Sequence, residues 1–130
     1  MDFVQPPGWK RPSGYSNGVI ASGRTVFVAG QIGWDPATCA FATDDFLAQF
    51  EQALANVVAV VRAAGGLPEH VAKLTLYATD KRRYLADLPA VGAAYRRHLG
   101  KHFPAMALVQ VSALVEDRAL IEIEATAVIP

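Results

Sequence analysis

The sequence predicts an α+β fold in which one mixed β-sheet carries two helices on one of its faces. Two observations point to this class. Apolar and polar residues alternate over 25–32, 71–79, 103–114 and 120–129, which is the spacing of strands that bury one side. Apolar residues recur every three or four positions over 44–64 and again over 84–99, which is the spacing of helices with one apolar face. The order strand, helix, strand implies a right-handed crossover and two parallel strands.

The ordered part of the chain is expected to begin after an irregular lead-in at 1–14, because this segment holds three of the eight prolines together with two glycines. The first long strand, 25–32, is dense in β-branched and aromatic residues. Gly30 within it indicates a bulge, or a place where a ligand or another backbone comes close.

The first helix is expected to be capped by Thr43 or Asp44, with Gln49 and Asn56 on its solvent-facing side. The second helical region is interrupted by Pro89, which fits the first turn of a helix and not its middle.

The last two strand-like runs are predicted to form an antiparallel hairpin around a loop at 116–118. One face of this hairpin is apolar and is assigned to the core: Ala107, Val109, Val111, Ala113, Ile121, Ile123, Ala125, Ala127 and Ile129. The other face combines Met106 and Leu108 with Glu122 and Glu124. A mixed exposed face of this kind is typical of contact surfaces, so a closed homo-oligomer that packs sheet against sheet is expected.

Length and composition narrow the class of protein. The 130 residues are expected to form one domain, 1–130, large enough to bury a core. Zero formal net charge and the lack of a Lys/Arg run predict no nucleic-acid partner. No stretch has the length and hydropathy of a membrane span or the pattern of a signal peptide, so no membrane partner is expected. The single cysteine, Cys39, fits a reducing, cytoplasmic location.

No metal and no cofactor are expected. His98 and His102 have the four-residue spacing of metal ligands on a helix, but Gly100 lies between them and no third ligand is evident.

Five short segments occur in a particular order and spacing: YSNGV at 15–19, VFVAGQIGWDP at 26–36, QALANV at 52–57, VAKLTLY at 71–77 and IEIEA at 121–125. Together they resemble the RidA/YjgF/UK114 family, formerly called endoribonuclease L-PSP, over nearly all of 15–128. The resemblance implies a chorismate-mutase-like fold and a homotrimer assembled through the bare face of the sheet. It also implies small-molecule pockets between subunits, which in the best-understood members hydrolyse reactive enamines and imines.

Carried over position by position, the resemblance implies that Tyr15 and Glu122 are catalytic. Glu122 would activate water for attack on an iminium carbon, and Tyr15 would orient the substrate or donate to its nitrogen. The implied substrate-binding residues are Ala29, Gly30, Gln31, Ile32, Trp34, Met106 and Leu108. The structural alternatives are a glutamate that makes interface hydrogen bonds, a tyrosine that anchors the N-terminal segment, and, for Trp34, a core aromatic at a turn.

The chain departs from the family pattern at Met106, where the family has an arginine that holds the substrate carboxylate. A thioether offers neither charge nor donor, whereas such a charge-assisted contact is worth about 1.5–3 kcal/mol. Ala29 replaces the usual serine, and Leu108 adds a third apolar position. A 2-imino acid is therefore not expected to be the best substrate, unless a cation at 10–11 or Lys101 supplies the charge from another direction.

Three hypotheses follow. The first is a trimer that hydrolyses, or at least binds, a small imine, enamine or related carbonyl compound with no obligatory carboxylate at the residue 106 end. The second is a non-catalytic ligand-binding trimer of the same fold. The third, RNA cleavage or translation inhibition as described for some relatives, ranks last because the chain has no basic or aromatic platform for RNA.

Overall fold

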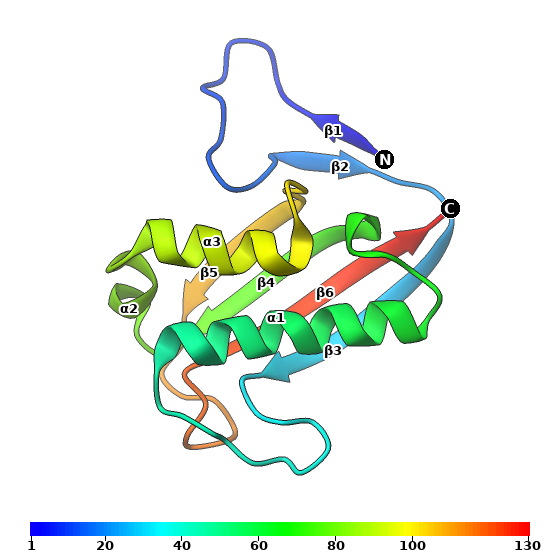
Figure 1. The fold of residues 1–130 in the computed structure, drawn as a ribbon. Helices are drawn as coiled ribbons and strands as arrows, with labels where there is room; N and C mark the ends of the chain where they lie inside the picture. Colours follow the sequence, from blue (N-terminus) through cyan, green and yellow to red (C-terminus); the bar gives the residue numbers. More distant parts are fainter.

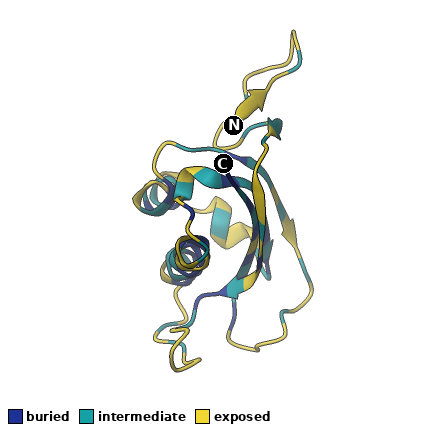
Figure 2. Cartoon of the chain, turned by 90° about the vertical axis from the view of Figure 1, so that its right-hand side faces the viewer, coloured by how far each residue is buried: buried dark blue, intermediate teal, exposed yellow.

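A computed structural model describes residues 1–130 (Figure 1). The elements in chain order are β1 (Asp2–Val4), β2 (Gly18–Ile20), β3 (Arg24–Ile32), α1 (Phe46–Ala63), the 3₁₀ turn η1 (Pro68–His70), β4 (Val71–Ala78), α2 (Lys81–Leu85), α3 (Leu88–Leu99), β5 (Ala105–Gln110) and β6 (Ile121–Ile129). A four-stranded mixed sheet has the order β3-β6-β4-β5. Helices α1 and α3 run across one face of this sheet, and the other face is left bare (Figures 1 and 2). The predicted α+β class, with helices on one face, is confirmed.

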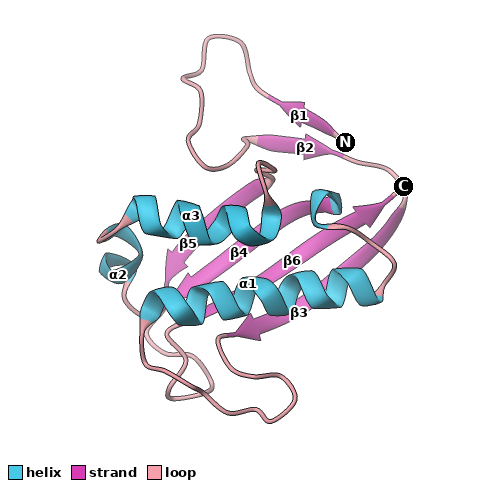
Figure 3. Ribbon diagram, in the orientation of Figure 1, coloured by secondary structure: helices cyan, strands magenta, loops and turns pink.

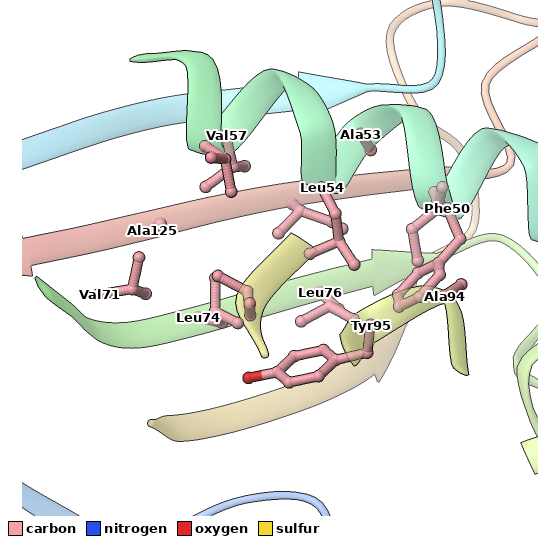
Figure 4. Packing of buried hydrophobic residues seen from close by; sticks show 14 of the residues in the cluster. Phe50, Ala53, Leu54, Val57, Val71, Leu74, Leu76, Ala94, Tyr95 and Ala125 are labelled. Atoms are coloured by element: carbon pink, nitrogen blue, oxygen red, sulfur yellow. The ribbon is translucent and has the colours of Figure 1, made fainter. Parts of the chain in front are cut away.

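The core lies between the sheet and the helices (Figure 4). Phe50, Leu54 and Val57 from α1 meet Leu74 and Leu76 from β4, and all five are at most 1% exposed. Burying each of these side chains stabilises the fold by about 1.5–3 kcal/mol. The three- and four-residue spacing in α1 therefore identified its buried face correctly.

The helices begin close to the predicted positions. The cap of α1 is Asp45, whose Oδ2 accepts a hydrogen bond from the Ala48 amide at 2.9 Å, and not Thr43 or Asp44 as predicted. Thr43 instead supports the cap, because its hydroxyl accepts from the Asp45 amide at 3.0 Å. Pro89 lies in the first turn of α3, as predicted. None of the helices combines the length and hydropathy that a membrane crossing requires.

Two amides of α1 are buried, and the prediction that they face solvent is wrong. Gln49 Nε2 donates to the carbonyls of Thr43 and Arg118, both at 3.0 Å, and its Oε1 accepts from the Leu120 amide at 2.9 Å. Asn56 Nδ2 donates to the carbonyls of residues 32 and 34, at 3.1 and 3.0 Å. These bonds tie the β3–α1 and β5–β6 loops, which lie at one end of the sheet, to the helix (Figure 3).

The last two strands do not form the predicted hairpin. β5 pairs in parallel with β4, and β6 lies between β3 and β4, antiparallel to both. Both edges of β6 are occupied, so β5 is left at the border of the sheet. Residues 111–120, expected to be strand ends around a three-residue turn, are instead a loop. That loop only has to cross β4, about 10 Å of sheet, well within its reach.

The pairing with β4 also reverses the predicted orientation of β5. Met106 pairs with Leu74 and Leu108 with Leu76, and paired residues of neighbouring strands point to the same side of a sheet. Because Leu74 and Leu76 are buried beneath the helices, Met106 and Leu108 pack against the same core. The prediction that Met106 and Leu108 share a face with Glu122 is wrong.

The bare face of the sheet, called the open face below, is mixed in character. Ala107 and Val109, which were predicted to be core, are exposed there, and Val111 and Ala113 lie in the loop after β5. The predicted core side of β6 is correct, with buried side chains at Ile121, Ile123, Ala125, Ala127 and Ile129. The open face carries, from β3, β4, β5 and β6, Phe27, Lys73, Thr75, Tyr77, Ala107, Val109, Glu122, Glu124 and Thr126.

Residues 1–20 form an arm beyond the main sheet (Figure 1). The arm is not wholly irregular, as was predicted for 1–14, because β1 pairs with β2 in an antiparallel ladder. Ser16 ties the arm to the body: its amide donates to the Pro104 carbonyl at 3.0 Å and its hydroxyl to the Phe103 carbonyl at 2.5 Å. The ring of Phe3 lies edge-on to His102, with ring centres 5.8 Å apart.

Candidate functional site

A bulge in β3 brings Gly30 against Glu122. The register between β3 and β6 shifts between Val28 and Gln31, which is the irregularity that a glycine within this strand predicted. A Cβ atom placed on Gly30 would lie only 2.7 Å from the carboxyl carbon of Glu122. Glycine at this position therefore lets the Glu122 carboxylate lie against the β3 backbone.

Of the two glutamates on the open face, Glu122 is the one with no hydrogen-bond partner in the chain. Its carboxylate is half-buried and makes no hydrogen bond or ion pair within the chain. Glu124, two residues along the same strand, accepts a hydrogen bond from the Tyr77 hydroxyl at 2.7 Å. That bond raises the pKa of Tyr77 above its usual value. The lone pairs of Glu122 are thus free for water or a ligand, while one oxygen of Glu124 is engaged.

Tyr15 is held beside the start of β5. Its neighbour Ser16 forms an isolated parallel bridge with Ala105, one residue before Met106. The Tyr15 side chain is partly exposed, and its phenol makes no hydrogen bond within the chain. The arm therefore brings Tyr15 to the same border of the sheet as residue 106.

Tyr15 and Met106 are far from Glu122 within one copy of the chain. β4 separates β5 from β6, so their backbones are two strand spacings, about 10 Å, apart. Tyr77 of β4 pairs with Glu122 on one side and with Val109 of β5 on the other, so Glu122 and Val109 lie at the same height in the sheet. Met106 is three residues before Val109, which adds ~10 Å along the strand direction. Met106 also points to the opposite face. A single copy of the chain therefore does not bring Tyr15, Met106 and Glu122 into one pocket.

The remaining predicted binding residues belong to the end of β3. Ala29 is exposed, and its carbonyl accepts a hydrogen bond from Gln31 Nε2 at 3.1 Å. Ile32 is buried, and the half-buried Trp34 packs on Phe41 with ring centres 5.8 Å apart. Asn56 fixes the carbonyls of Ile32 and Trp34. The bulge beside Glu122 is therefore followed by a segment fastened to α1.

A hollow of about 890 Å³ lies between the arm and the segment that follows α3, and Tyr15 is part of its wall. The proline- and glycine-rich composition of 1–14 predicts irregular structure and gives no sign of such a hollow.

The two histidines with metal-ligand spacing have separate partners. Nε2 of His98 is 3.1 Å from Oε1 of Glu51, whereas Nε2 of His102 is 2.6 Å from the Val71 carbonyl. No group of three or more His, Cys, Asp or Glu side chains is placed to hold a metal ion.

Comparison with known proteins gives consistent results. The family model described as Endoribonuclease L-PSP matches residues 9–129. The chain is 41% identical over 109 residues to the 2-iminobutanoate/2-iminopropanoate deaminase of Salmonella typhimurium, covering 82% of this chain and 80% of that protein. It is 34% identical over 128 residues to the human protein of the same name, covering 98% and 88%. A solved structure from Yersinia pestis, described as a protein of unknown function of the conserved Rid family, has a TM-score of 0.86, with 35% identity and 98% coverage of both chains.

Proposed function

Because the chain belongs to the RidA/YjgF/UK114 family, described by the Endoribonuclease L-PSP model, we propose that it hydrolyses the carbon–nitrogen bond of a small imine or enamine. The observation that carries this proposal is the unpartnered Glu122 carboxylate beside the Gly30 bulge. A carboxylate with free lone pairs can hold a water molecule and take its proton during attack on carbon. Relatives named 2-iminobutanoate/2-iminopropanoate deaminase support the reaction class.

In the proposed reaction, Glu122 accepts a proton as the water oxygen bonds to the iminium carbon, and the π electrons of the C=N bond move to nitrogen. The carboxyl group then returns its proton to the nitrogen of the resulting carbinolamine. The C–N bond breaks, ammonia leaves with the hydroxyl proton, and a carbonyl compound remains. One water is consumed and nothing is oxidised or reduced. An enamine follows the same route once its carbon has been protonated.

The proposed substrate needs no carboxylate at the residue 106 end. Met106 offers no charge there, and burying an unpaired carboxylate against a thioether is costly. The second candidate function is non-catalytic ligand binding. Position 106 is methionine where the resemblance implies an arginine, and such a loss is also what abandonment of the reaction would produce. RNA cleavage has weaker support, since the open face presents Glu122 and Glu124 beside one lysine, Lys73, and like charges repel phosphate.

We further propose that the pocket forms between copies of the chain in a homotrimer. Tyr15 and Glu122 cannot meet within one copy, and the open face exposes 82% of Phe27. Light scattering should give a mass three times the 13.9 kDa of the chain. Phe27→Asp should lower that mass, whereas Val115→Asp, at a loop residue that is 97% exposed, should not. A monomeric wild type at micromolar concentration would contradict the proposal.

The reaction is tested by ammonia release from an imine without a carboxylate, generated in the assay from a primary amine by a flavin-dependent amine oxidase. Glu122→Gln should lower the rate about 100-fold, the usual contribution of a positioned general base. Glu124→Gln, on the same strand and face, is the matched control and should change the rate much less. Equal rates for wild type and Glu122→Gln would refute the role of Glu122.

Comparing the wild type with a Met106→Arg variant distinguishes a catalytic protein from one that only binds its ligand. β5 is a border strand, so an arginine stem can carry its charge past the apolar contacts to the edge. A gain in hydrolysis of a 2-imino acid would support a working catalytic frame. Inactivity of both wild type and variant on acidic and neutral imines would favour the non-catalytic alternative.

A further inference from the structure

The hollow between the arm and the body is large enough for a ligand of moderate size. One side is made by residues 3–5, 9 and 11–17 of the arm and the other by Lys101 and Phe103. Its volume of about 890 Å³ is within the range of small-molecule pockets. Hydrogen bonds inside the arm hold its shape: Asn17 Nδ2 donates to Gln5 Oε1 at 2.7 Å, and Gln5 Nε2 donates to the Trp9 carbonyl at 3.2 Å.

The hollow is positively charged. Arg11 reaches it from the arm and Lys101 from the body, and no aspartate or glutamate is among the residues that line it. Neither cation makes an ion pair or a side-chain hydrogen bond elsewhere in the chain; the ion pairs of the protein involve Arg82, Arg97, His98 and Arg118. Two free cations facing one space attract an anion, and the guanidinium fork matches a carboxylate.

The wall also contains four aromatic side chains among smaller and polar residues. Phe3, Trp9, Tyr15 and Phe103 line the hollow, and 62% of Trp9 is exposed. The ring of Phe103 is held in place by stacking on Tyr95 of α3, with ring centres 5.4 Å apart. Aromatic surface beside two cations favours a ligand with an aromatic or bulky apolar body and one negative end.

We propose that this hollow binds the carboxylate of a small acid that has an aromatic or bulky apolar body, with Arg11 and Lys101 as its charge partners. Met106 is not among the lining residues, whereas Tyr15 is. Taken with the proposed function, on which this part rests, the substrate would be an imine whose carboxylate is separated from the reacting carbon by an apolar body. Such a compound differs from a 2-imino acid, whose carboxylate is attached directly to that carbon.

Binding of phenylacetate and of its neutral isostere phenylacetamide to the full-length protein, measured by calorimetry, tests the inference. Phenylacetate should bind at least about tenfold more tightly than phenylacetamide, and Arg11→Gln and Lys101→Gln should each weaken it about five- to tenfold, since exposed charges are partly screened. Lys10→Gln removes a neighbouring cation that does not line the hollow, and it should leave affinity unchanged. All three cations are exposed, so these variants should fold.

The inference is overturned if phenylacetate does not bind, if it binds no more tightly than phenylacetamide, or if Lys10→Gln weakens it as much as Arg11→Gln. Its failure is distinguishable from failure of the proposed reaction, because Glu122→Gln should retain phenylacetate affinity. A protein that binds phenylacetate through Arg11 but hydrolyses no imine would keep this inference and refute the proposed function. Hydrolysis without Arg11-dependent binding would do the reverse.

Discussion

Gly30→Ala should separate stability from activity, because the atoms that a new methyl group would meet belong to a side chain and not to the backbone. The methyl carbon would lie 2.7 Å from Cδ, 2.9 Å from Cγ and 3.0 Å from Oε1 of Glu122. The Glu122 side chain can rotate away, so the free energy of unfolding should fall by less than about 1 kcal/mol. Its carboxylate would then be displaced by more than 1 Å, and ammonia release should fall about 100-fold, as for loss of the base itself.

Gly33→Ala is the matched control on the same strand end. A methyl group there would lie 2.5 Å from Cα and 2.6 Å from the carbonyl oxygen of Gln49, which are backbone atoms of α1 and cannot rotate away. Such overpacking costs about 3 kcal/mol, or roughly 10 °C in Tm for a chain of this size. Differential scanning calorimetry should therefore show a clear loss for Gly33→Ala and almost none for Gly30→Ala. If Gly30→Ala retains full activity, the position of Glu122 against the bulge has no part in the reaction.

Two further variants test contacts of α1. The hydrogen bond from Arg97 lowers the pKa of Glu51 to about 2, with His98 as a second donor, so its stabilisation is complete above pH 4.5 and is lost as the pH falls toward 2. In denaturant titrations near neutral pH, the wild type should be about 1 kcal/mol more stable than Glu51→Gln, a value already reduced for solvent screening. At pH 2 the two proteins should be equally stable. A difference that does not change with pH would contradict this. Gln49→Ala should lower the free energy of unfolding by about 3 kcal/mol, because three backbone groups lose their buried hydrogen-bond partner. Gln52 lies on the same helix but is partly exposed, so Gln52→Ala should lower it by less than about 1 kcal/mol. Equal losses for Gln49 and Gln52 would refute the burial argument.

The sequence could predict which side chains of β6 are buried but not which side chains of β5 are, because only β6 alternates apolar and charged residues. In β6, Ile121 and Ile123 alternate with glutamates, so only one phase of the alternation buries apolar side chains. In β5, every residue from Ala105 to Val109 is apolar, so either phase gives an acceptable core face. The phase is set by which strand β5 pairs with, and that partner, β4, is distant in sequence.

The candidate site was predictable to a similar degree. Gly30 indicated a close approach in β3, and the structure shows Glu122 there. The burial of Gln49 and Asn56 was not predictable, because their polar side chains are satisfied by loop carbonyls whose positions depend on the whole fold. Nor does the sequence of the arm indicate that Arg11 and Lys101, ninety residues apart, line the same hollow.

The strand order gives the two parts of the proposed site different mechanical support. β6 is hydrogen-bonded along both edges, so the backbone that carries Glu122 is held on each side. Tyr15 and Arg11 belong to an arm whose contacts with the body centre on Ser16 and Phe3. A general base must be placed accurately, while groups that grip the far end of a substrate can vary in position. Substitutions in the border strand and in the arm can therefore alter which compound is bound without disturbing the Glu122 carboxylate on β6.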